Sequence, residues 1–173
     1  SSRNFATKLW NAARFAMMNG ANVNGELPDI KNVNHINQWI LNRLNETIVE
    51  VDKNLEAFEF QKACDAVYHF AWDDVCDWYL ELTKDIFARG GAEAEVTQRV
   101  LGHVFDQLMR LLHPVMPFIT EALWQPLTGG QSLVVSQWPS AAPLHDQSAV
   151  AKNRKSTRLN SSHVSESRMP SSA

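Results

Sequence analysis

Residues 36–58 of the chain read INQWILNRLNETIVEVDKNLEAF, and their apolar residues recur at steps of three and four. This period places one apolar stripe along a single helix face, so the stretch predicts a long, half-buried α-helix. The stripe consists of Ile36, Ile40, Leu44, Ile48, Val51, Leu55 and Phe58. Asn34 stands just ahead of it, and an asparagine side chain can accept from the first free N–H groups of a helix.

A second long helix is predicted over residues 60–88. Gly90 and Gly91 follow it, and glycine commonly ends a helix because it tolerates a left-handed backbone. The residues expected to face inward are Cys64, Val67, Phe70 or Ala71, Val75, Trp78, Leu82 and Ile86.

The rest of the chain adds further helices. Residues 93–112 predict a third long helix, which Pro114 stops, and Pro117 can open a short one. With a helix at the start of the chain, the pattern predicts an all-α bundle of four main helices and a short fifth. An extended cover segment is expected around SLVVSQWP, residues 132–139.

Composition divides the chain into a domain and a tail. Residues 1–149 predict one helical domain, and residues 150–173 predict a disordered tail that is serine-rich and poor in apolar residues. A non-native read-through sequence and a natural basic tail both fit this composition. The chain has no initiator methionine, which suggests a piece of a longer protein. Its two cysteines favour a reduced, cytoplasmic setting.

Few patterns point to catalysis. The seven glycines form neither a phosphate-binding loop nor a dinucleotide motif, so no cofactor is expected in this stretch. Cys64, His69 and Cys76 lack a fourth metal ligand and are expected to be structural. The chain therefore predicts a binding module rather than an active site.

An acidic ladder, defined as Asp73, Asp77, Glu81 and Asp85, repeats every four residues along the second helix. Like charges at this spacing repel one another by a few tenths of a kcal/mol per pair. The ladder is either a solvated face, partly neutralised by Lys84, or a surface against which the basic opening helix lies.

The opening helix has a mixed polar face. At about 100° per residue, its polar side chains fall within an arc of roughly 140°. Phe5, Leu9, Ala12, Ala13 and Ala16 occupy the opposite side and are expected to face the core. Cations, amides and flanking aromatics such as Trp10 and Phe15 suit a single-stranded RNA loop. An ordinary amphipathic helix would show a similar division. The arc contains Arg3, Asn4, Thr7, Lys8, Asn11 and Arg14.

Three motifs together resemble the C-terminal anticodon-binding domains of valyl-tRNA synthetases. They are RNFATKLWNAARF (3–15), FAWDDVCDWYLELTK (70–84) and RLLHPVMPFITEALW (110–124). The resemblance runs from about Ser2 to Pro139 and implies a helix bundle of the class I synthetase anticodon-binding type. The motif at 76–81, CDWYLE, argues against the equivalent domain of an isoleucyl or leucyl enzyme. A protein-interaction bundle is the other alternative.

The resemblance also implies partners. The expected ligand is the anticodon loop of tRNA(Val), and the expected neighbour is a catalytic domain of the same parent chain. That domain would use ATP and Mg²⁺, so this stretch alone should catalyse nothing. Neither DNA nor a membrane is an expected partner. The predicted tRNA-binding residues are Arg3, Asn4, Lys8, Asn11 and Arg14.

The anticodon chemistry assigns roles within that set. Valine codons begin with GU, so their anticodons share A at the middle position and C at the third. An asparagine amide pairs with the adenine edge, and a carboxylate accepts from the cytosine amino group. Asn4 and Asn11 are the candidates for the adenine, and the acidic ladder offers the carboxylates. Arg3, Lys8 and Arg14 would contact phosphates, which carry no sequence information.

Overall fold

Helical segments account for most of residues 2–23, 26–128 and 137–141, which this computed structural model describes. The predicted all-α class is confirmed, and these residues contain no strand. None of the described helices combines the length and the apolar character that a membrane span requires. The elements are α1 (Ser2–Met18), η1 (Ile30–Asn32), α2 (His35–Glu56), α3 (Phe60–His69), η2 (Phe70–Tyr79), α4 (Leu80–Arg89), α5 (Gly91–Leu112) and α6 (Pro117–Thr128).

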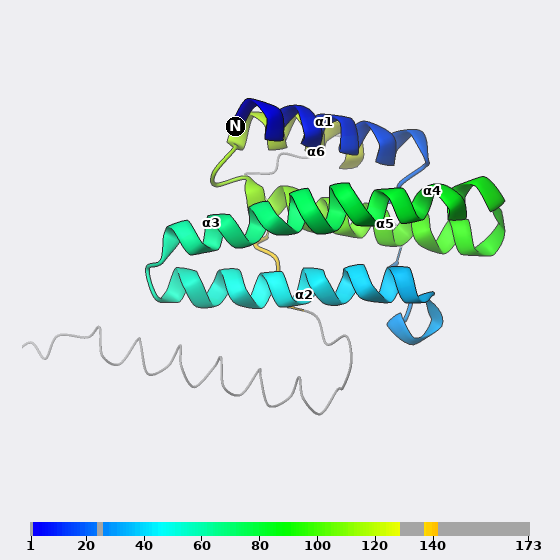
Figure 1. The fold of residues 1–173 in the computed structure, drawn as a ribbon, viewed down its shortest axis with the longest axis horizontal. Coiled ribbons are helices and arrows are strands. Elements are labelled where there is room, and N and C mark those ends of the chain that lie inside the picture. The colour runs from blue at the N-terminus through cyan, green and yellow to red at the C-terminus, as the bar shows by residue number, and fades with distance from the viewer. Residues whose placement is uncertain (1, 24–25, 129–136, 142–173) are drawn as a thin grey trace, which may run out of the picture. The chain divides into compact units, whose positions relative to one another are not determined.

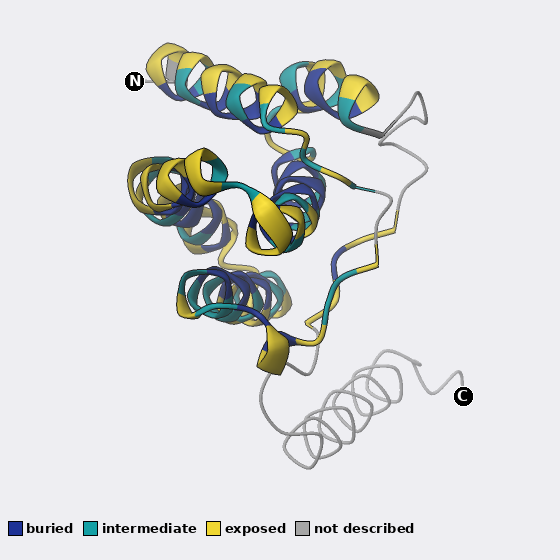
Figure 2. Cartoon of the chain, turned by 90° about the vertical axis from the view of Figure 1, so that its right-hand side faces the viewer, coloured by how far each residue is buried: buried dark blue, intermediate teal, exposed yellow. Residues whose placement is uncertain are grey.

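Segments α3, η2 and α4 form one continuous helix, because the backbone stays helical at both junctions. This long helix and α5 make the middle layer of the bundle, with α2 on one side (Figure 1). Helices α1 and α6 lie on the other side, where α1 contacts η2, α5 and α6 (Figure 2). The predicted four main helices and short fifth are therefore present.

The predicted helix ends are largely confirmed. The Asn34 side chain accepts a hydrogen bond from the backbone N–H of Asn37 at 2.8 Å and so caps α2. Gly90 ends α4 with a φ of 69°, a left-handed value that suits glycine. Helix α5 ends at Leu112, two residues before Pro114, and α6 begins at Pro117.

The inner face of α1 is the one that the sequence predicts. All five of its expected core residues are buried, and the aromatic ring of Phe5 lies 4.8 Å from that of Tyr68 in α3. Farther along α1, Phe15 and Phe87 of α4 are 6.3 Å apart, measured between ring centroids. Helix α1 therefore runs alongside the long helix and buries its apolar side against the bundle.

The middle of the long helix departs from the prediction. Segment η2 is a π-helix, in which the N–H of Leu80 donates to the carbonyl of Val75, five residues back. An α-helix would bond four residues back, so the π turns shift the inward face by one residue. Tyr79 and Thr83 are buried in place of Trp78 and Leu82, which are 63% and 40% exposed. The prediction that Trp78 and Leu82 face inward is wrong for this reason.

A buried chain of hydrogen bonds links the π-helix η2 to helices α2 and α5. The Tyr79 hydroxyl donates to the side-chain carbonyl of Asn37 in α2 at 2.6 Å. The Asn37 amide donates in turn to the Thr97 hydroxyl of α5 at 3.0 Å. Burial raises the pKa of Tyr79 well above its usual value, so the phenol stays protonated and can donate. These bonds hold η2 in its shifted register.

Two further inward predictions are wrong. Phe58 is 68% exposed, because α2 ends at Glu56 and the chain turns at Phe58 with a φ of 58°. Cys64 is also exposed, since α3 presents Ala63 and Val67 to the core instead.

The expected cover segment is described only over residues 137–141. This part is neither helix nor strand, and the Trp138 indole donates to the Asp52 carboxylate of α2 at 3.0 Å. The Arg110 guanidinium of α5 donates to the Gln137 carbonyl at 3.0 Å. The segment thus lies against α2 and α5, in agreement with a covering role. Residues 129–136 and the predicted tail at 150–173 lie outside the described residues, so the domain boundary stays a prediction.

Candidate nucleic-acid interface

The outer face of α1 carries the side chains that the sequence singles out. Arg3, Asn4, Asn11 and Arg14 are exposed, whereas Lys8 is half-buried. Figure 2 shows the same division along the helix, with the outer side exposed and the inner side buried. No hydrogen bond or ion pair joins the four exposed side chains to another residue of the described ranges. These four side chains are therefore available to a ligand.

Helical spacing divides these residues into two rows. Asn4 and Asn11 lie four positions before and three positions after Lys8, so the three share one side of α1. Arg3 and Arg14 are eleven positions apart, which is close to three full turns. We call Asn4, Lys8 and Asn11 the amide row, and Arg3 and Arg14 the arginine row.

Lys8 fixes the direction in which the amide row faces. Its ammonium group forms an ion pair with Asp77 of η2 and lies 3.9 Å from the centroid of the Trp72 ring. A cation over an indole face is attracted by the negative face of the ring. The amide row consequently borders the seam between α1 and η2. Lys8 already has a partner within the domain, a contact that a phosphate would have to displace.

Three of the four residues of the acidic ladder contact a basic side chain. The prediction that the opening helix lies against it is confirmed at Asp77, which pairs with Lys8. Two other members pair within the long helix itself, where His69 contacts Asp73 at 3.3 Å and Lys84 contacts Glu81 at 2.7 Å. All four ladder residues are exposed. Both interpretations of the ladder therefore hold, each for part of it.

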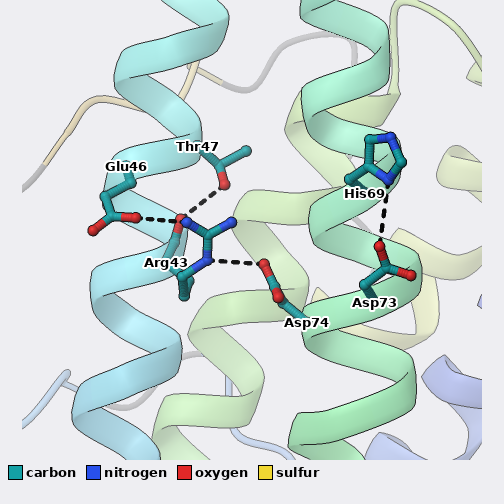
Figure 3. Close-up of polar contacts among 6 residues, drawn as sticks. All are labelled: Arg43, Glu46, Thr47, His69, Asp73 and Asp74. Carbon is teal, nitrogen blue, oxygen red and sulfur yellow. Dashed lines mark hydrogen bonds and ion pairs between the residues drawn. The ribbon is translucent and has the colours of Figure 1, made fainter.

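A further ion pair joins η2 to α2 on the other side of the ladder. The Arg43 guanidinium donates to Asp74 at 3.0 Å and to Glu46 at 2.6 Å (Figure 3). Partial burial of Arg43 lowers its pKa, but the hydrogen bond and charge of Asp74 outweigh this, so the net pKa is raised. Arg43 therefore stays charged. The sequence does not predict this pair, because Arg43 belongs to no quoted motif and its contact with Asp74, which lies within the motif at 70–84, depends on how α2 packs against η2.

The cysteines and histidines considered as metal ligands or catalytic groups have different surroundings. Cys64 is exposed, and Cys76 is half-buried, with burial raising the pKa of its thiol to about 11. The imidazole of His113 lies 3.0 Å from the Thr120 hydroxyl, a contact that holds the turn between α5 and α6. Over the described ranges, no three His, Cys, Asp or Glu side chains gather closely enough to hold a metal ion.

Known proteins similar to this chain are valine–tRNA ligases. The chain is 55% identical over 148 residues to the enzyme of Streptomyces coelicolor, which is 86% of this chain and 17% of that protein. It is 58% identical over 142 residues to the enzyme of Nocardia farcinica, which is 82% of this chain and 16% of that protein. It is 51% identical over 139 residues to the enzyme of Mycobacterium tuberculosis, which is 80% of this chain and 15% of that protein. The chain thus spans about one sixth of the length of these curated relatives.

A family model gives a matching result. The model described as the anticodon-binding domain of tRNA ligase matches residues 37–170, which is most of the chain. The helix bundle, with its polar outer face on α1, is the architecture that the sequence resemblance implies. The chain belongs to the family of anticodon-binding domains of tRNA ligases.

Proposed function

We propose that this chain is the tRNA-binding module of a valine–tRNA ligase and that it binds the anticodon loop of tRNA(Val). The observation that carries the proposal is the outer face of α1, where exposed arginines and amides stand without partners in the described chain. Valine–tRNA ligases among the relatives support the choice of amino acid over isoleucine or leucine. A docking bundle for proteins would have no need of the exposed amides.

The two rows of α1 suit two different parts of an RNA loop. The arginine row faces solvent, where Arg3 and Arg14 can hold phosphates, because guanidinium groups match phosphate geometry. The amide row borders η2, so a base that enters the seam would meet Asn4 or Asn11 on one side. On the other side, the base would meet carboxylates of the acidic ladder, which can accept a hydrogen bond from a cytosine amino group. Asp73 and Asp77 are the ladder residues of η2, and the cytosine would compete there with the contact of Asp73 to His69 or of Asp77 to Lys8.

The parent enzyme would supply the chemistry. Its catalytic domain would bind ATP and Mg²⁺ and esterify valine to the tRNA, in the cytoplasm. The present domain would position the tRNA by its anticodon, and its own residues would hold no cofactor.

Alanine substitutions in the two rows should distinguish residues that contribute to affinity for RNA from residues that contribute to base specificity. We expect Arg14→Ala to weaken binding of matched and mismatched anticodon stem-loops equally. It should also make the dependence of log affinity on log salt shallower by about 0.7, the value for one contact to single-stranded phosphate. Asn11→Ala should instead reduce discrimination at the middle adenine by about 1–3 kcal/mol, with an unchanged salt slope. Fluorescence anisotropy at several salt concentrations measures both quantities.

Asn4→Ala is the parallel test in the amide row, because Asn4 and Asn11 are both candidates for the adenine. If both asparagine variants lose equal affinity for matched and mismatched loops, the amide row does not recognise the adenine. Helix α1 would then hold phosphates only.

A further inference from the structure

Trp78 stands out on the outer face of η2. Its side chain is 63% exposed, although a tryptophan in a helix bundle is normally mostly buried. The exposure follows from the π-helix, because buried Tyr79 is hydrogen-bonded to Asn37 and its neighbour must point outward. Segments of π-helix inside α-helices occur frequently at functional sites. The shifted register therefore holds an indole ring in solvent at a fixed place.

Two of the carboxylates around Trp78 are held in ion pairs. Three carboxylates, Asp73, Asp74 and Asp77, share the outer part of η2 with it. Asp74 is paired with Arg43 and Asp73 contacts His69, as Figure 3 shows. Asp77 is paired with Lys8. An RNA loop that approaches Trp78 would thus meet two carboxylates, Asp74 and Asp77, that are already ion-paired.

Trp78 also lies next to the candidate interface. It follows Asp77, so their Cα atoms are about 3.8 Å apart, and the Asp77 carboxylate contacts Lys8 of the amide row. On its other side, Asp74 lies four residues back and binds Arg43 of α2. Trp78 therefore stands between two aspartates of η2, of which Asp77 is paired with Lys8 of α1 and Asp74 with Arg43 of α2.

We propose that Trp78 is a stacking platform for an unpaired base of the anticodon loop, in addition to the bases that α1 contacts. This inference rests on the proposed function. Protein partners favour broad apolar patches, whereas Trp78 and Leu82 are the two large hydrophobic side chains exposed on η2 and α4. An exposed flat ring beside a candidate RNA-binding helix is instead the arrangement on which unstacked RNA bases stack.

The test compares Trp78→Ala with Trp78→Phe in the full 173-residue chain. The probe is the anticodon stem-loop of tRNA(Val), with 2-aminopurine at one unpaired loop position at a time. We expect Trp78→Ala to weaken binding about five- to 150-fold and to abolish the stacking-induced quenching at one position. Trp78→Phe should retain the quenching, because a phenyl ring also stacks. Leu82→Ala, at a neighbouring exposed residue of α4, is the control and should bind as the wild type does.

The outcomes distinguish this inference from the proposed function. If the wild-type chain binds the stem-loop and Trp78→Ala binds it equally with unchanged quenching, the stacking role is overturned and the proposed function stands. If the wild-type chain does not bind the stem-loop, the proposed function fails and the stacking role fails with it. Unchanged thermal midpoints for all variants establish that each of them is folded.

Discussion

Replacing Tyr79 by alanine is expected to lower the free energy of unfolding by about 3–5 kcal/mol, the usual cost of removing a buried aromatic side chain. Tyr79 is fully buried, and its hydroxyl donates to Asn37 in the bond that joins η2 to α2. The substitution would leave a cavity and a buried amide carbonyl without its donor. Because small domains are stable by only about 5–15 kcal/mol, the loss should be plain in urea denaturation followed by circular dichroism.

Two control variants identify the source of that loss. Tyr79→Phe removes only the hydroxyl, so it should cost about 1–3 kcal/mol, the penalty for an unsatisfied buried polar group. Tyr68→Ala removes the same kind of side chain from α3, where it is 37% exposed, and should cost less than Tyr79→Ala. If Tyr79→Ala costs no more than Tyr68→Ala, Tyr79 does not hold the register of η2.

Gly102→Val is the second substitution with a large expected effect. A Cβ atom at Gly102 would lie 2.4 Å from the backbone carbonyl oxygen of Asn22, in the segment that follows α1. Backbone cannot move aside as a flexible side chain can, so α5 and this segment must separate. Overpacking of this kind typically costs about 1–3 kcal/mol. Differential scanning calorimetry should show a lower thermal midpoint.

The consequence of Gly102→Val should extend to α1. The segment after α1 is also tied to Gln98 of α5, which accepts from the Asn22 N–H at 3.0 Å and donates to the Asn19 carbonyl at 2.9 Å. Displacing it would loosen the end of the helix that carries the arginine row. Ala92→Val, at an exposed site of α5, is the control and should change the midpoint little. An equal midpoint for Gly102→Val and Ala92→Val would contradict the close approach.

The sequence predicts most of the fold because its apolar period is regular. The opening helix shows this best, since one face carries only small or apolar residues and all five of its expected core residues are buried. Asn34 and Gly90 mark helix ends by chemistry that acts locally, so a single residue suffices to predict them. Local rules of this kind need no knowledge of the packing partners.

The π-helix could not be predicted in the same way. A step of three or four from Val75 leads to Trp78 and then Leu82, whereas the structure buries Tyr79 and Thr83. The choice depends on the bond from Tyr79 to Asn37, which joins residues 42 positions apart in the chain. One signal was present, because Tyr79 also lies four residues after Val75, but the α-helical period gave no reason to prefer it.

The candidate site was only partly predictable for a related reason. The residues of α1 could be identified from their helical spacing, whereas contact of α1 with the ladder was one of two alternatives that the sequence left open. Arg43 was not found, because its pairing with Asp74 depends on how α2 packs against η2. The exposure of Trp78 was missed because it results from the shift in register. The Arg43–Asp74 pair and the exposure of Trp78 thus depend on contacts between residues far apart in the chain, which sequence patterns do not predict.

The most direct test of the proposed function is a comparison of anticodon stem-loops that differ at a single base. The wild-type chain should bind the loop with the valine anticodon, and replacing its middle adenine or its third cytosine should weaken binding by about 1–3 kcal/mol each. Replacing a loop base outside the anticodon by another base should have a smaller effect. Equal affinity for all of these loops, or no binding to any of them, would contradict anticodon recognition by this domain.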